Sequence, residues 1–381
     1  MQIYLDNAAT TKIHPKVIEK MLPYLRDNYG NPSSIHSWGR KSRVAIEESR
    51  EIIADFINAD PSEIYFTSCG TEATNFIING ISLCEKEESG KNLLITSAGD
   101  HKATLQSIRN LESKGFNSTI LKLNKDFTIE TERFGEFADK NTSLLSVVHV
   151  NNEIGTINNL SELVGVSKGY YTHTDAVQSF GKIKIDVNKL GIHSLSASAH
   201  KLYGPKGIGI AYVKSETPMH SFILGGGQER NRRAGTENVA SIVGFAEAVT
   251  VAKENMEENF KRVSELRKYL KNGLDASING LFFNESEINS PYILSVTFDP
   301  ELYNNDSEAI LMYLDINGIA ASSGSACASG TLKPSHVILS AGYPEKYANG
   351  TLRFSFSSEN TFEEMKYAIE IMKRLSQKIR K

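Results

Sequence analysis

The sequence predicts an α/β protein built around a mainly parallel sheet with helices on its faces. Short apolar segments alternate with amphipathic helical segments over roughly two hundred residues, which is the pattern of strand–helix–strand units. Polar residues come after several apolar stretches, with Asp100 after LLITS, Asn152 after LLSVVHV and Asp175 in YYTHTDAVQ. Because ligands of such sheets bind beyond the carboxyl ends of the strands, we expect one crevice to collect these side chains.

Individual elements are predicted from apolar spacing and from turn residues. Apolar residues spaced three and four apart predict helices, and Pro15 suits the first turn of the first helix. The predicted helices cover residues 14–25, 43–57, a segment that begins at Gly70, and 102–114. Short apolar runs between polar turns predict strands. The predicted strands cover residues 1–6, 64–67, 92–96, 119–123, 144–150, 195–199 and 208–213.

The composition limits the classes of function. A chain of 381 residues with 40% hydrophobic residues has enough apolar surface for a large core and for two lobes. A net charge of −3 gives no electrostatic reason to expect nucleic acid or an anionic membrane as a partner. Three unclustered cysteines predict neither a disulfide framework nor a metal site. No apolar run reaches transmembrane length and no signal peptide opens the chain, so we expect a cytoplasmic protein.

Lys201 is the first candidate for chemistry. It ends an apolar and small-residue run and precedes a glycine-rich turn, in the sequence SASAHKLYGPKG. A lysine held in such a part-buried place loses some of its preference for the charged form, which leaves a free amine to form a Schiff base with a carbonyl. An ordinary loop lysine is the competing interpretation of this stretch alone.

Cys327 is the second candidate. It lies in SSGSACASG, a run of small polar residues that predicts an exposed thiol on a mobile loop rather than a core cysteine. A free surface cysteine is the alternative. Together with Lys201, the pair suggests a carbonyl cofactor on the lysine and a nucleophile that can move toward it.

The remaining polar residues fit one such cofactor, pyridoxal phosphate. Gly70 and Thr71 open a helix after a strand, where free N–H groups favour an anion such as a phosphate, although Thr71 could be a plain helix cap. Asp175 could keep the ring nitrogen protonated, so that the ring acts as an electron sink, and it could also be only a cap. Gln178 could donate to the ring oxygen. His101 could stack on the ring and move protons, if it is not merely structural.

Motifs along almost the whole chain resemble those of the class V, fold-type I pyridoxal-phosphate enzymes, and most closely the NifS/IscS-type cysteine desulfurases. The matching stretches are YLDNAATT, GNPSSIH, the segment 66–72, HVNNEIGTI, HTDAVQSFGK, SASAHKLYGPKGIG, GGGQERNRRAGTENV, SSGSACASG and TLRFSF. The SSGSAC form of the cysteine loop is that of the NifS/IscS group. Cys69 departs from the pattern, because relatives usually carry a small residue such as glycine there.

The resemblance implies a role for each matched residue. Lys201 would carry the cofactor, and Cys327 would take sulfur from L-cysteine to become a persulfide. The cofactor-binding set would be Gly70, Thr71, His101, Asn152, Asp175, Gln178, Ser198, His200, Lys201 and Thr236, with Thr236 reaching the site of a partner subunit. Asn152 and Arg353 would hold the substrate carboxylate. His101 would join Lys201 and Cys327 as a catalytic residue.

The resemblance also implies an architecture and partners. We expect a large domain at residues 13–255 with a seven-stranded sheet, and a small α+β domain formed by residues 1–12 and 256–381, which carries the cysteine loop at about 322–333. We expect a homodimer that passes sulfur to an acceptor protein, such as an iron–sulfur scaffold or a tRNA-thiolation protein. A class V aminotransferase, a selenocysteine lyase and a non-enzymatic assembly subunit are the alternatives.

Overall fold

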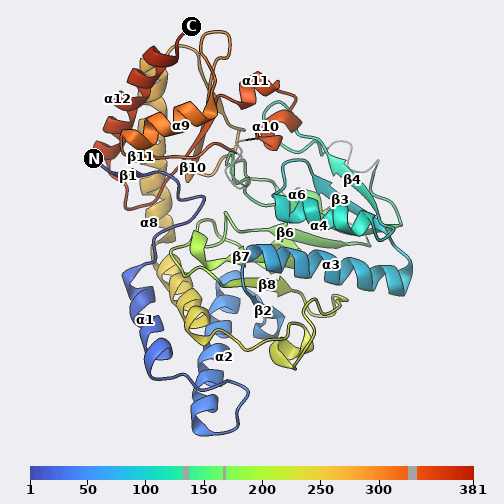
Figure 1. Cartoon of the computed structure of the whole chain (residues 1–381). Coiled ribbons are helices and arrows are strands. Elements are labelled where there is room, and N and C mark those ends of the chain that lie inside the picture. Colours follow the sequence, from blue (N-terminus) through green and yellow to red (C-terminus); the bar gives the residue numbers. More distant parts are fainter. Residues whose placement is uncertain (132–136, 166–168, 325–332) are drawn as a thin grey trace.

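The computed structural model describes residues 1–131, 137–165, 169–324 and 333–381, and its larger unit is a seven-stranded sheet covered by helices (Figure 1). The strand order is β2-β8-β7-β6-β5-β3-β4. Strand β8 is antiparallel to both of its neighbours, and the other pairs are parallel. The seven strands are β2 (Ile64–Thr67), β3 (Leu93–Ser97), β4 (Asn117–Leu121), β5 (Thr142–Val148), β6 (Tyr171–Asp175), β7 (Ser194–Ser198) and β8 (Gly209–Val213). The predicted α/β class with a mainly parallel sheet is confirmed.

Helices form where the sequence predicts them, although some begin or end at other residues than predicted. The longer ones are α1 (Pro15–Arg26), α2 (Ser37–Ile57), α3 (Gly70–Ser89), α4 (Lys102–Glu112), α8 (Val239–Ser277), α9 (Ser307–Ile316) and α12 (Phe362–Ile379). Shorter ones are α6 (Leu160–Gly165), α7 (Val187–Leu190), α10 (His336–Ser340) and α11 (Glu345–Ala348). Helix α2 begins earlier than predicted because the His36 ring caps it, accepting from the Gly39 N–H at 3.2 Å.

Two strands start two residues before the predicted positions. Strand β5 begins at Thr142 rather than at Leu144, because Thr142 and Ser143 are fully buried in the sheet although they are polar. Strand β4 begins at Asn117, and most of its side chains are at least partly exposed because it is the edge strand. Apolar spacing cannot locate either start, since the residues concerned are hydrophilic.

The chain ends come together in a second, smaller unit. Strands β9 (Leu281–Asn284), β10 (Ile293–Phe298) and β12 (Thr351–Ser355) form an antiparallel sheet, and β1 (Ile3–Tyr4) pairs in parallel with β11 (Ile319–Ala320). One hydrophobic core joins residues of β1 to α9, α12 and the second half of α8. The first half of α8 belongs to a core beneath the large sheet. The predicted boundary between residues 255 and 256 thus falls inside a continuous helix, and this division stays a prediction.

The described residues hold neither a membrane-spanning helix nor a metal-binding cluster. Among these residues, no helix is long and apolar enough to cross a membrane. Nor do the described ranges contain a group of three or more His, Cys, Asp or Glu residues that could hold a metal ion.

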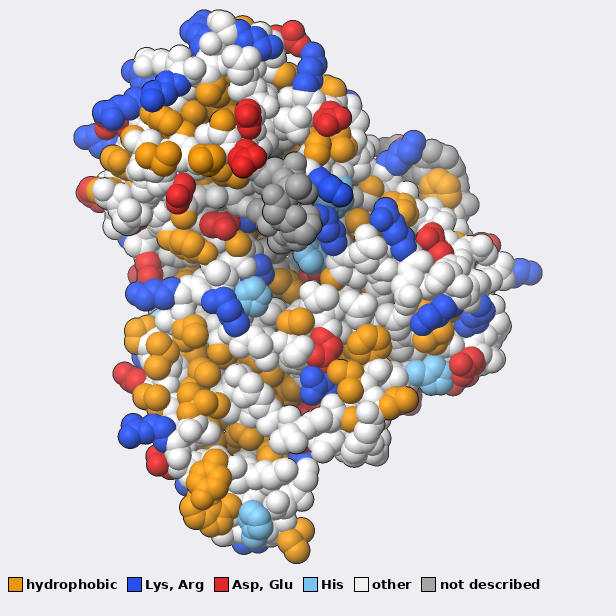
Figure 2. Space-filling view, in the orientation of Figure 1, with side chains coloured by type: hydrophobic (Ala, Val, Ile, Leu, Met, Phe, Trp, Pro, Cys, Tyr) orange, Lys and Arg blue, Asp and Glu red, His pale blue; other side chains and the backbone are white. Residues whose placement is uncertain are grey.

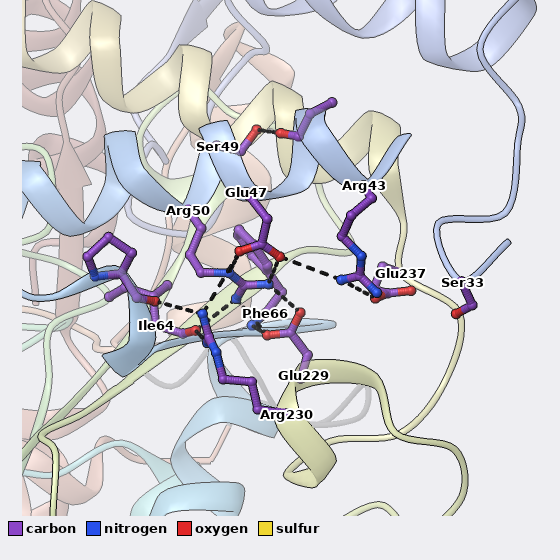
Figure 3. Close-up of polar contacts among 12 residues, drawn as sticks. Ser33, Arg43, Glu47, Ser49, Arg50, Ile64, Phe66, Glu229, Arg230 and Glu237 are labelled. Carbon is purple, nitrogen blue, oxygen red and sulfur yellow. Dashed lines mark hydrogen bonds and ion pairs between the residues drawn. The ribbon is translucent and has the colours of Figure 1, made fainter. Parts of the chain in front are cut away.

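A buried ion pair ties the segment 225–238 to α2 and β2 (Figure 3). The Arg50 guanidinium donates to both carboxylate oxygens of Glu229 at 2.8 and 2.9 Å, and both side chains are 2% exposed. The same carboxylate accepts from the Phe66 N–H at 2.8 Å. Burial of two charges is costly unless they are paired and hydrogen-bonded, and these two are both.

This pair holds a strained stretch of backbone. Glu229, Arg230 and Asn231 have φ angles of 44°, 56° and 62°, a left-handed conformation that side chains disfavour. Three such residues in succession persist only where surrounding contacts hold them. The carboxylate of Glu229 supplies part of these contacts, and the Arg230 guanidinium adds hydrogen bonds to the carbonyl oxygens of Pro61, Ser62 and Ile64.

We predict that Glu229→Gln lowers the free energy of unfolding by about 3 kcal/mol or more, because it leaves the Arg50 charge buried beside a neutral amide. Glu47→Gln is the matched control. It removes the other acidic partner of Arg50, but Glu47 has a 42% exposed side chain, so the cost should stay under about 1 kcal/mol. Urea denaturation of both variants measures the difference, and equal costs would contradict the prediction.

Candidate functional site

A cavity of about 330 Å³ opens at the carboxyl ends of β3, β5, β6 and β7. The turns that follow these strands supply its walls, together with the start of α3 and residues from the chain ends. The sequence-predicted residues that line it are Gly70, Thr71, His101, Asn152, Asp175, Gln178, Ser198, His200, Lys201 and Arg353. Figure 2 shows the molecular surface in the orientation of Figure 1, with the undescribed residues in grey.

Asp175 ends β6 and is buried at the cavity wall. Its Oδ1 accepts from the Val177 N–H at 2.9 Å. Burial raises the pKa of this carboxyl group, while the nearby His101, the Val177 N–H and Lys201 act in the opposite direction. A buried carboxylate beside an open cavity favours a ligand that brings it a positive charge or a donor.

Lys201 lies in a 3₁₀ turn, Ala199–Lys201, directly after β7. Its Nζ donates to the carbonyl oxygens of Ala8 and Ala9 at 2.6 and 2.7 Å. Gln178 Nε2 donates to the same Ala8 oxygen at 2.9 Å. The motif DNAATT marks this segment in the sequence, but it does not predict these backbone acceptors, because a carbonyl group carries no side-chain signal.

The start of α3 forms another wall. Cys69 is the helix cap, since its Sγ accepts from the Glu72 N–H at 3.5 Å. The interpretation of Thr71 as the cap was therefore wrong, because Thr71 already lies in the first helical turn. A Cβ on Gly70 would come within 2.7 Å of the Val177 side chain, so the helix start needs glycine to pack here.

Ser198 and His200 line the same cavity as this helix start. Ser198 Oγ is buried, and it has no hydrogen-bond partner among the described residues. Burial lowers the pKa of His200 to about 4, with Lys201 acting in the same direction. Its Nδ1 is 3.2 Å from Thr10 Oγ1. The ring is therefore neutral at pH 7, and it can act as a hydrogen-bonding group rather than as a cation.

His101 caps α4, with Nδ1 accepting from the Ala103 N–H at 3.1 Å. Burial lowers its pKa, although the carboxylate of Asp175 acts in the opposite direction. Because Nδ1 is an acceptor, the proton of the neutral ring is on Nε2. The structure thus gives His101 a capping role and at the same time places it on the cavity wall.

Arg353 comes from β12 and reaches the cavity from the smaller sheet. Its two terminal nitrogens donate to Asp6 Oδ1 at 2.8 Å and to the Asn152 carbonyl oxygen at 2.9 Å. Its Nε is buried and has no partner among the described residues. The guanidinium is thus held in a fixed orientation with further N–H donors available, that of the buried Nε among them.

Two predicted residues are not placed at this cavity. Thr236 is exposed and lines a different cavity of about 200 Å³ with Arg233 and Glu237. Cys327 lies outside the described residues. The described chain before it ends beside the site, since Ser322 pairs with Arg353 through two backbone hydrogen bonds.

The residues of the cavity fit pyridoxal phosphate on three structural observations. A lysine amine and a buried carboxylate face one cavity, as a Schiff base and a protonated ring nitrogen require. The orphaned Ser198 hydroxyl and the N-terminus of the 20-residue helix α3 offer donors for a phosphate. Gly70 keeps the helix start free of a side chain.

Comparisons with known proteins agree with this geometry. The model of the family "Aminotransferase class-V" matches residues 3–367. A cysteine desulfurase IscS from Dictyoglomus turgidum is 41% identical over 382 residues, which cover 100% of this chain and 95% of that protein.

Solved structures are similar over the same length. A NifS-like protein covers 100% of both chains with 34% identity and a TM-score of 0.91. SspA, solved in complex with cysteine, covers 94% of this chain and 100% of its own with 34% identity and a TM-score of 0.80. The chain therefore belongs to the class V aminotransferase family, in its NifS/IscS-like branch.

Proposed function

We propose that this protein is a cysteine desulfurase that converts L-cysteine to L-alanine and keeps the sulfur on Cys327. One observation carries the proposal: Lys201, the buried Asp175 and the fixed Arg353 line one cavity, and the chain that leads to Cys327 begins beside it. The relatives named above, which are cysteine desulfurases or NifS-like, support the same reaction.

Pyridoxal 5′-phosphate is the cofactor of this family, and when bound it supplies a ring that withdraws electrons from the α-carbon of an amino acid. Lys201 would carry it and Asp175 would hold the proton on its ring nitrogen. Gln178 would donate to its ring hydroxyl, and His101 would lie on the ring face. The phosphate would be held by Gly70, Thr71, Ser198 and His200.

Arg353 and Asn152 would bind the carboxylate of L-cysteine. A guanidinium whose fork is fixed by Asp6 binds a carboxylate in one orientation, which places the α-carbon relative to Lys201. The amine of Lys201 would then remove the α-proton and later return a proton to the product. Neutral His101 would transfer the further proton that the reaction needs besides the one that Lys201 carries.

Cys327 would attack the sulfur of the substrate as a thiolate. A sulfur–sulfur bond forms while the bond between the substrate's β-carbon and its sulfur breaks. The electron pair of the broken bond goes to the β-carbon, which takes up a proton, so alanine leaves and Cys327 retains a persulfide. Cys327 is the third residue after Gly324, which packs against Glu153 beside Asn152. An extended chain of three residues spans up to about 10 Å, and we propose that this stretch brings the thiol to the substrate. A free thiol has a pKa of about 8.5, so the environment of Cys327, or His101 as a proton carrier, would have to supply the thiolate.

The persulfide would pass to an acceptor protein, such as an iron–sulfur scaffold or a tRNA-thiolation protein, and we propose a cytoplasmic location for this transfer. The acceptor must approach the side of the site from which Cys327 comes. The division into a large domain at 13–255 and a small domain from both chain ends is part of the same proposal.

A homodimer would complete the site, because Thr236 is exposed and lies outside the cavity of its own chain.

Large apolar side chains near one end of the molecule support a dimer. The side chains of Tyr29 and Trp38 are 74% and 53% exposed, and their rings contact each other. Ile35, which lies between them in the sequence, is 91% exposed. Figure 2 shows hydrophobic side chains gathered over this end, where Figure 1 places α1 and α2. Patches of this kind mark protein interfaces.

We predict that Cys327→Ala abolishes the release of sulfide and alanine from L-cysteine in the presence of a reductant, while the absorbance of the bound cofactor remains. Without the nucleophile, the carbon–sulfur bond has no acceptor for its sulfur. Cys84→Ala, which changes a buried cysteine of α3 outside the cavity, should leave turnover unchanged. An active Cys327→Ala variant would favour an aminotransferase or a selenocysteine lyase instead.

We predict that Arg353→Lys lowers kcat/KM for L-cysteine by about tenfold to a hundredfold. An ammonium group cannot donate two parallel hydrogen bonds to the substrate carboxylate as a guanidinium can. L-Cysteine methyl ester is the matched control, since it lacks the carboxylate. Its turnover should change little between the two proteins. An equal loss with both substrates would show that the variant only disturbs the fold.

We predict a molecular mass in solution of twice the 42.1 kDa of one chain, measured by analytical ultracentrifugation. Trp38→Glu should shift the protein toward the monomer, because it introduces a charge into the exposed apolar patch. A wild-type monomer would remove Thr236 from the proposed site.

A further inference from the structure

Lys182 is a buried lysine that the proposed mechanism does not use. It is only 6% exposed, and it lies four residues after Gln178 on the turn that follows β6. Removal of an ammonium group from water is costly, so lysines are rarely buried without a partner or a function. The contacts of Lys182 lead toward the cofactor cavity.

A chain of polar contacts runs from Lys182 to Lys201. Lys182 Nζ donates to Gln178 Oε1 at 3.4 Å. The other end of this amide, Nε2, donates to the Ala8 carbonyl oxygen at 2.9 Å, and that oxygen also accepts from Lys201 at 2.6 Å. Gln178 therefore connects a buried amine on one side to the acceptor shared with Lys201 on the other.

The two contacts of Gln178 allow one orientation of its amide. If the amide were reversed, Oε1 would face the Ala8 oxygen, so two acceptors would meet, and the amide nitrogen would face the amine of Lys182. Without Lys182, Oε1 would lose the partner that these hydrogen bonds give it, in a side chain that is 5% exposed. A buried acceptor left in this way is unfavourable, and the amide would gain freedom to turn.

The surroundings of Lys182 reduce its charge. Burial lowers its pKa to about 7, and the positive charges of Lys201 and Arg353 act in the same direction. Its Nζ lies 5.3 Å from the centre of the Tyr292 ring, which offers only a weak cation contact. An amine that is only partly protonated near pH 7 still donates a hydrogen bond, but it does not place a full charge behind Gln178.

We propose that Lys182 is a positioning residue, which holds the Gln178 amide so that the N–H of Nε2 not bonded to Ala8 is available to the ring hydroxyl of the cofactor. This inference rests on the proposed function, because the role of Gln178 is assigned there. It adds a residue that lies outside the cavity and acts only through its neighbour.

The test is a double-mutant cycle on the holoenzyme, with Lys182→Met, Gln178→Ala and the double variant. Methionine has a similar volume and no donor. Lys182→Met should shift the visible absorbance maximum and raise the dissociation constant of pyridoxal phosphate about tenfold. In the Gln178→Ala background, Lys182→Met should change neither quantity further, because the two residues act as one unit.

Lys184→Met is the matched control, since Lys184 is an exposed lysine two residues away, and it should leave both readouts unchanged. If the Lys182→Met variant does not fold, Lys182→Leu takes its place in the same double-mutant cycle. Unchanged absorbance and affinity in a folded Lys182 variant, or an equal effect with and without Gln178, would overturn the inference. A holoenzyme that shows the coupled effect but releases no sulfide would reject the desulfurase function and keep the role of Lys182.

Discussion

The site depends on the backbone carbonyl groups of Ala8 and Ala9. They accept from Lys201, and the Ala8 oxygen also accepts from Gln178. On its other side, the Ala8 N–H donates to Ser355 Oγ of the smaller sheet at 2.8 Å. A short N-terminal segment therefore links the candidate cofactor lysine to the strand that carries Arg353. The two groups that would act on a substrate are positioned relative to each other through this segment, although they are far apart in the sequence.

Electrostatics at the site follow from burial more than from charge pairing. Burial is the largest influence on the pKa of Asp175, His101 and Lys182, raising the first and lowering the other two. All three changes favour uncharged forms in the absence of a ligand. The cofactor carries a protonated nitrogen and a phosphate, which can pair with charged forms of these side chains. We therefore expect the site to be most polar when the cofactor is bound.

The sequence was sufficient to predict the class of fold and the residues that follow the strands, because parallel strands place their carboxyl ends at one edge. It could not predict the contacts of the Ala8 and Ala9 carbonyl groups, the capping role of Cys69 or the connection from Lys182 to Gln178. Backbone acceptors have no sequence signal, and a lysine in a turn is normally exposed. The early start of β5 was also missed, since burial of Thr142 and Ser143 depends on their neighbours in the sheet.

Helix α8 has a consequence for how the molecule loses its structure. Its 39 residues run without a break from the core beneath the large sheet to the core of the smaller unit. If one core unfolded alone, its half of the helix would fray. This would expose apolar side chains of the other core. The two units should accordingly lose their structure together, as one cooperative transition, even though each has a sheet of its own.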